Sequence, residues 1–128
     1  MKPKKIWANF GVQDLERTTH FYQQLGFKPN GASGQLTSFF FGEEEFIIHF
    51  FLKEVLEPGM KGKLSDATKG NEIIFTISAR SRDEVDAWAK QVEPAGGTLV
   101  SNPKAFGEGY YGFVFTDPDG HKFNVFFM

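Results

Sequence analysis

YYGFVFTDPDGHKFNVFFM, residues 110–128, predicts the β-hairpin around which the rest of the chain is arranged. Two aromatic and β-branched runs flank an Asp-Pro-Asp-Gly turn, in which Pro118 presets φ and Gly120 supplies a positive φ. Because side chains alternate along a strand, each face of the last strand carries its own set of residues. The sets are Phe123, Val125 and Phe127 on one face, and Asn124, Phe126 and Met128 on the other. If the first set packs on a helix, the second faces whatever the sheet encloses.

The length and composition predict one compact, soluble domain. The 128 residues contain no cysteine and carry a net charge of −2, with acidic and basic residues mixed along the chain. The absence of cysteine fits a reducing cytoplasm, and the mixed charge gives no electrostatic sign of nucleic-acid binding. The basic start, residues 1–5, is followed by no apolar signal-peptide core or membrane span. We therefore expect a cytoplasmic protein with no membrane or nucleic-acid partner.

Phenylalanine is the unusual feature of the composition. The chain has 16 phenylalanines, several times the average usage. In a domain of this size, so much aromatic surface either over-fills the core or lines an apolar pocket.

The order of apolar patterns predicts the same supersecondary unit twice. Residues 5–12 alternate as a strand, residues 14–25 carry a helical stripe behind an N-cap at Asp14, and three more strands follow up to residue 51. From residue 72 the order restarts with a strand, a helix with capping-box spacing at 81–84, a short strand at 98–101 and the closing hairpin. Residues 53–69 have little periodicity and are interpreted as a linker rather than a lid.

This repeat predicts an α+β fold. Two βαβββ modules, residues 1–52 and 70–128, would form a curved mixed sheet around a cavity with the helices outside. The residues expected to face that cavity are Trp7, Asn9, Ile47, His49, Phe51, Glu72, Ile74, Thr76, Asn124, Phe126 and Met128.

Several motifs, taken in this order and spacing, resemble the vicinal oxygen chelate superfamily, the glyoxalase, bleomycin-resistance and extradiol-dioxygenase group. They are Val12 to Arg17, Phe21-Tyr22, Leu25-Gly26-Phe27 and Asp117 to His121. The resemblance covers essentially the whole chain. It implies the fold just described and, in metal-dependent members, one His or Glu ligand on each of the first, fourth, fifth and eighth strands.

Carried onto this sequence, those four ligand positions fall on Trp7, His49, Glu72 and Asn124. Tryptophan cannot ligate a metal ion, and a neutral amide brings no charge to a divalent cation. The resemblance therefore implies a site without a resident metal, with Ni, Zn, Mn or Fe held by His49 and Glu72 as the alternative.

Three roles are open for His49 and Glu72: a metal-binding pair, a general base that acts on a substrate C–H, or a structural hydrogen-bonded pair. A box of aromatic rings would stack on a planar ligand or simply fill the space, with two asparagines as polar anchors. The box residues are Trp7, Phe51, Tyr110, Tyr111 and Phe126, and the anchors are Asn9 and Asn124. His20 and His121 are expected at the surface.

Three classes of function follow. The favoured one is a metal-free aromatic cavity that binds a small or planar apolar compound, as bleomycin-resistance relatives do. The alternatives are a glyoxalase-, epimerase- or dioxygenase-like enzyme that uses His49 and Glu72, and an interaction module with a filled core. The resemblance also implies a homodimer, with modules paired within one chain or across two.

Overall fold

The computed structural model describes residues 1–128, which form two compact units. The N-terminal unit is Met1–Ser65 and the C-terminal unit is Asp66–Met128. Each contains a four-stranded mixed sheet and a helix that packs on it, in the order β-α-β-β-β. The predicted α+β fold of two βαβββ modules is confirmed. None of the helices is long and apolar enough to span a membrane.

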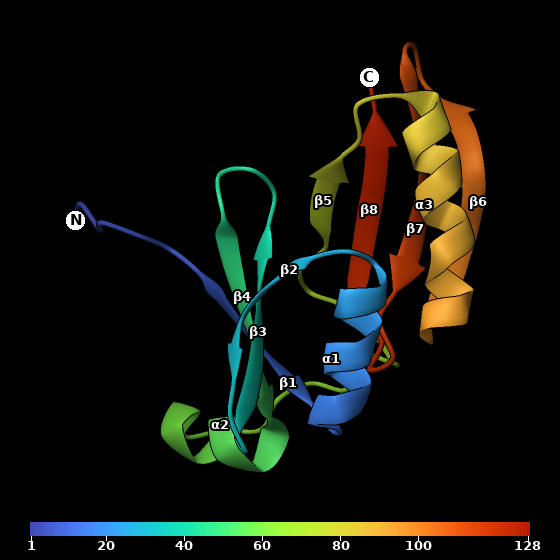
Figure 1. Cartoon of the computed structure of the whole chain (residues 1–128). Helices are drawn as coiled ribbons and strands as arrows, with labels where there is room; N and C mark the ends of the chain where they lie inside the picture. The colour runs from blue at the N-terminus through green and yellow to red at the C-terminus, as the bar shows by residue number, and fades with distance from the viewer. The chain divides into compact units, whose positions relative to one another are not determined.

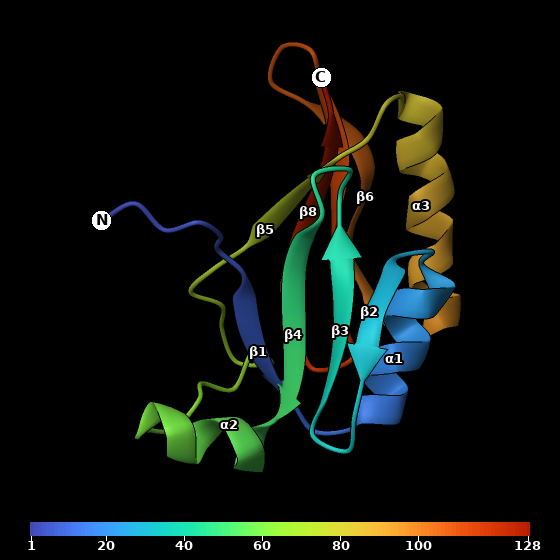
Figure 2. The ribbon, with the colours of Figure 1, turned by 60° about the vertical axis from the view of Figure 1, so that its left-hand side comes forward.

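The sheet of the N-terminal unit has the strand order β1-β4-β3-β2 (Figure 2). β1 runs parallel to β4, and the other neighbours are antiparallel. Its elements are β1 (Ala8–Val12), α1 (Leu15–Gln24), β2 (Lys28–Ala32), β3 (Leu36–Phe41), β4 (Phe46–Leu52) and α2 (Lys53–Met60).

Tyr22 is the centre of the N-terminal core. It is fully buried on α1, and its ring stacks on Phe50 of β4 with centroids 4.5 Å apart. The carboxylate of Asp14 accepts a hydrogen bond from the Arg17 amide at 3.0 Å, so the predicted N-cap is confirmed. The cap starts the helix where its apolar stripe can reach the sheet.

The C-terminal unit repeats this topology with the strand order β5-β8-β7-β6. β5 is parallel to β8, and α3 lies along the sheet beside β6 and β7 (Figure 1). Its elements are β5 (Phe75–Ser78), α3 (Arg82–Ala95), β6 (Thr98–Phe106), β7 (Tyr110–Thr116) and β8 (Lys122–Phe127).

The predicted capping box starts α3. The Ser81 hydroxyl accepts from the Glu84 amide at 3.1 Å, and the Glu84 carboxylate accepts from the Arg80 amide at 3.1 Å. Beneath the helix, Phe115 and Phe123 stack with centroids 5.2 Å apart. Both rings are buried, so adjacent strands of the predicted hairpin supply the core.

Each sheet has one face covered by the helix of its own unit and an opposite face, called here the open face. In β4, Ile48 and Phe50 are buried beneath α1, whereas His49 and Phe51 point to the open face and are half-buried. In β8, Phe123 and Val125 are buried, and the residues between them face the other way. The predicted alternation of both strands is therefore confirmed.

The segment 53–69, interpreted as a linker, is not irregular throughout. Residues 53–60 form α2, which packs on β4 and β1. Pro58 lies in the second half of this short helix, and Lys61 ends it at φ 55°. The segment has few apolar residues, but they pack on the sheet. Leu64 lies so close to Gly11 that a Cβ added to the glycine would come within 2.3 Å of the leucine Cδ1.

Two predicted strands begin later than expected. β1 starts at Ala8 and β5 at Phe75, so Trp7 and Glu72 precede the strands to which they were assigned. Glu72 is exposed in a bend.

The turn between β7 and β8 is built on a buried carboxylate. Asp117 Oδ1 accepts from the amides of Asp119 and His121 at 3.0 and 2.9 Å, and Oδ2 lies 2.7 Å from His121 Nδ1. His121 is 6% exposed, so the expectation that it lies at the surface is wrong. The reason is that Asp117 folds back over the turn and brings the imidazole inside. His20, in contrast, is exposed as predicted.

Replacement of Gly120 by alanine should destabilise the fold. Gly120 has φ 97°, and a Cβ would lie 2.7 Å from the carbonyl carbon of Ala67. Strained backbone together with a backbone clash predicts a loss of about 1–3 kcal/mol in the free energy of unfolding. Urea denaturation measures it. Gly34→Ala is the matched control, because a Cβ there meets nothing within 4 Å. Equal stability of the two variants would contradict this account.

Replacement of Asp117 by alanine should cost about 3 kcal/mol or more, because two amides and an imidazole lose their acceptor in a buried place. Calorimetric unfolding measures the loss. Asp83→Ala, an exposed position in the first turn of α3, should change stability by less than about 0.5 kcal/mol. A stable Asp117→Ala variant would show that the carboxylate is not structural.

Candidate functional site

His49 is the best-positioned titratable side chain on the open face of the N-terminal sheet. It lies in β4, opposite Asn9 of β1 on one side and Ser38 of β3 on the other. Its Nδ1 is 2.8 Å from Ser38 Oγ, and that hydroxyl accepts from the side-chain amide of Asn30 at 3.1 Å. Ser38 is 1% exposed. A chain of hydrogen bonds from β2 through β3 thus orients the imidazole.

Two aromatic rings flank this histidine. Trp7 meets His49 edge-on with centroids 6.3 Å apart, and Phe51 does so at 5.9 Å. Trp7, the larger of these two aromatic side chains, is 51% exposed. Three residues predicted for the site, Trp7, His49 and Phe51, therefore meet on one surface, with Asn9 exposed beside them.

The protonation of His49 is set by its surroundings. Burial lowers the pKa of His49 below its ordinary value, because the half-buried site disfavours the imidazolium. The neutral ring is therefore the form present near neutral pH.

A second aromatic group lies on the open face of the C-terminal sheet. Tyr110 stacks with Phe106 at 5.8 Å and approaches Phe126 at 5.9 Å. Asn124 lies two residues before Phe126 on the same face of β8, opposite Thr76 of β5 and Val114 of β7. Three predicted residues, Tyr110, Asn124 and Phe126, therefore share this face.

Tyr111 is placed differently from the prediction. Its hydroxyl donates to the carboxylate of Asp86 on α3 at 2.5 Å, and the guanidinium of Arg82 lies 4.9 Å from the centre of its ring. The hydrogen bond to Asp86 raises the pKa of Tyr111. The expectation that Tyr111 lines the cavity face with Tyr110 is wrong, because neighbouring residues of one strand point to opposite faces.

The donor set does not fit a resident divalent metal. Of the four ligand positions that the resemblance implies, Trp7 offers only an N–H donor and Asn124 a neutral amide. Glu72 is exposed ahead of β5. Within each unit, no three His, Asp or Glu side chains gather where they could hold an ion.

Ser38 and Asn30 were not predicted for the site. The sequence could have indicated Ser38. Phe41 pairs with Phe46 across the β3–β4 turn, and counting back from that pair places Ser38 opposite His49. A serine buried among aromatic residues needs a polar partner, and the histidine on the neighbouring strand is one. Asn30 could not be found this way, because the register of β2 against β3 shifts between Pro29 and Ala32.

Comparison with known proteins agrees with this architecture. The family model of the Glyoxalase/Bleomycin resistance protein/Dioxygenase superfamily matches residues 6–125. A hypothetical protein from S. aureus is similar over 100% of this chain and 96% of its own, with 30% identity and a TM-score of 0.88. A glyoxalase-related enzyme from Fulvimarina pelagi is similar over 98% of this chain and 89% of its own, with 20% identity and a TM-score of 0.86, which supports the fold alone.

A comparison with curated proteins found no match. The family match covers nearly all of both units described above, including Trp7 and the strands that carry His49 and Asn124. The chain therefore belongs to the Glyoxalase/Bleomycin resistance protein/Dioxygenase superfamily.

Proposed function

We propose that the protein binds a small planar apolar compound carrying one hydrogen-bond acceptor, without a resident metal. The observation that carries this proposal is the group formed by Trp7, His49 and Phe51, in which an imidazole oriented by Ser38 contacts two aromatic rings. Aromatic faces with one oriented polar group are typical of small-molecule sites. The Tyr110, Phe126 and Asn124 surface would offer the same combination to a ligand.

The hydrogen bonds around Ser38 allow a donor role for His49. The serine hydroxyl has one proton, which can go to His49 Nδ1 at 2.8 Å or to the Ile48 carbonyl at 3.5 Å. The 2.8 Å contact is a hydrogen bond in either direction, and the proposal takes the direction in which the hydroxyl donates to Nδ1. With Nδ1 as acceptor, the neutral ring carries its proton on Nε2. A ligand carbonyl is the complementary group.

The exposed Trp7 ring supplies the apolar part of the affinity. An aromatic side chain that is half exposed beside the His49 ring gains stability when a planar ligand covers it. Chelate-type enzymology is not proposed, because the four positions of the fold provide only one imidazole and one carboxylate.

Binding is tested with a matched pair of probes, 2-acetylnaphthalene and 2-ethylnaphthalene, which differ in the carbonyl. The chain has two tryptophans, so Trp88→Phe leaves Trp7 as the fluorescence reporter. We expect saturable quenching by both probes, with the ketone binding about tenfold more tightly. Calorimetric titration shows whether Trp7→Ala abolishes binding and whether His49→Phe removes the preference for the ketone.

The control for bound metal is elemental analysis of the native protein and of His49→Ala. Both are first dialysed against trace Ni²⁺, Zn²⁺, Mn²⁺ and Fe²⁺. Near-stoichiometric metal that is lost in this variant would contradict the proposal. So would ketone binding that is unchanged by Trp7→Ala.

The stability of the protein should fall as pH falls through the titration of His49. Because the folded-state pKa is lowered, the unfolded chain binds the proton more tightly, and stability is lost below about pH 6.5. The free energy of unfolding, measured by urea at pH 8 and pH 5, should decrease more in the native chain than in His49→Gln. His20→Gln, at an exposed site, is the matched control and should behave like the native chain. Identical pH dependence of native and His49→Gln proteins would refute the effect.

A further inference from the structure

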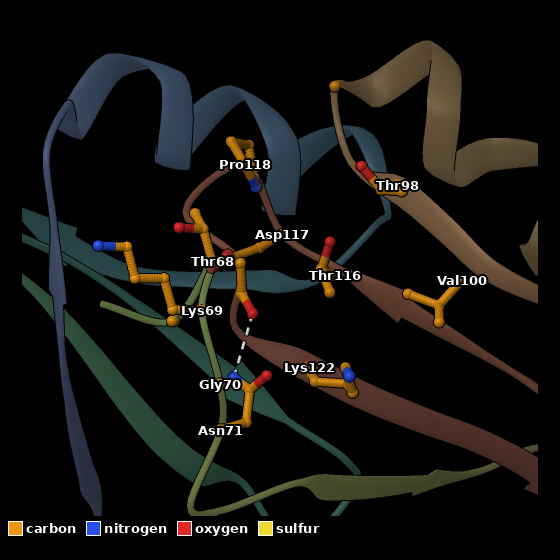
Figure 3. Close-up of a pocket in the computed structure, with 13 residues that line it drawn as sticks. Thr68, Lys69, Gly70, Asn71, Thr98, Val100, Thr116, Asp117, Pro118 and Lys122 are labelled. Carbon is orange, nitrogen blue, oxygen red and sulfur yellow. Dashed lines mark hydrogen bonds between the residues drawn. The ribbon is translucent and has the colours of Figure 1, made fainter. Parts of the chain in front are cut away.

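We propose that a hollow in the C-terminal unit binds a small oxyanion, a phosphate or carboxylate group, through Lys122, Thr116 and Thr98. This inference is independent of the function proposed above, which concerns other residues. The hollow has a volume of about 410 Å³ and lies between the β7–β8 turn and the segment 67–71 (Figure 3).

The three side chains form one row across the sheet. Thr98 of β6 pairs with Thr116 of β7, which in turn pairs with Lys122 of β8. Their neighbours Phe115 and Phe123 are buried on the helix-covered face, so the row lies on the open face. Directly paired residues on one face have Cβ atoms about 5 Å apart. Figure 3 shows the row in succession along one wall of the hollow.

The donors of this row are not used inside the protein. The Lys122 ammonium makes no ion pair or hydrogen bond, although the residue is half-buried, and the hydroxyls of Thr98 and Thr116 make none either. An anion that binds beside this lysine would pair with its unpartnered ammonium. Three unpaired donors on one wall, one of them charged, match the acceptor oxygens of phosphate or carboxylate.

The acidic residue at the hollow does not oppose an anion. Asp117 lines it, but its carboxylate is directed into the turn and occupied by the amides of Asp119 and His121 and by the His121 ring. The other charged residues of the lining are Lys69 and Lys122. The charge presented by the hollow is therefore positive in a chain whose net charge is −2.

The facing wall is held in place by packing on the turn. Asn71 Nδ2 donates to the Gly120 carbonyl at 3.1 Å, and Gly120 packs without a side chain on the backbone of Ala67 and Thr68. Asp66 caps the Thr68 amide at 3.0 Å. The wall is thereby formed without a ligand, and its volume suits a small metabolite rather than a macromolecule.

The test is titration of the ¹⁵N-labelled protein with sodium phosphate and, separately, with sodium acetate, each against sodium chloride at the same ionic strength. We expect saturable amide shifts at Thr98, Thr116 and Lys122, with a dissociation constant on the order of 1–10 mM for so small a ligand. Saturation by phosphate alone identifies a phosphate site, and saturation by acetate alone a carboxylate site. Saturation by both identifies a general oxyanion site.

The variants distinguish a specific binding site from nonspecific electrostatic attraction. Lys122→Gln should raise the dissociation constant by about tenfold or more, and Thr116→Val, of similar shape, by about threefold. Lys122→Arg should keep binding, and Lys104→Gln, which removes a charge elsewhere on the same sheet, should not change it. The proposal is overturned if neither anion saturates, if chloride gives the same shifts, or if Lys104→Gln weakens binding as much as Lys122→Gln.

Discussion

The buried carboxylate of Asp117 is the interaction on which the C-terminal unit depends. It binds two backbone amides and an imidazole within a five-residue turn, and so fixes where β7 ends and β8 begins. The same turn presents Gly120 to the segment 67–68 and its carbonyl to Asn71. One carboxylate therefore sets the strand register and the approach of the chain that enters the unit.

The two units have one topology but different open faces. In the N-terminal unit the central polar group is His49, oriented by Ser38 and flanked by aromatic rings. In the C-terminal unit the polar groups are the amide of Asn124 and the row that ends in Lys122. The helix-covered faces are both mainly apolar, because both must fill the space under a helix. Divergence is concentrated on the faces that packing leaves unconstrained.

The fold could be predicted from the sequence because alternation, caps and turn residues agree at every step. Asp14 and Ser81 cap as their spacing indicates, and Gly120 adopts the positive φ expected of it. Of the candidate site, the meeting of Trp7, His49 and Phe51 follows from strand alternation once the parallel pairing of β1 with β4 is assumed.

The rest depended on contacts that alternation does not encode. Tyr111 was predicted for the cavity although it follows Tyr110, and its position is fixed by Asp86 on α3. His121 was predicted at the surface, because the folding-back of the Asp117 side chain has no signature in the sequence. α2 was missed because its stability comes from packing on β4 and β1 rather than from its own periodicity.

The edge position of β1 has a dynamic consequence. β1 is a five-residue strand that pairs with β4 alone, and the pair closes a loop of more than thirty residues. This pairing can therefore open without loss of the remaining sheet. Trp7 directly precedes this strand and moves with it. A ring stacked on Trp7 would therefore restrain the fraying of the strand, so that occupancy of the aromatic surface and slow amide exchange in β1 would rise together.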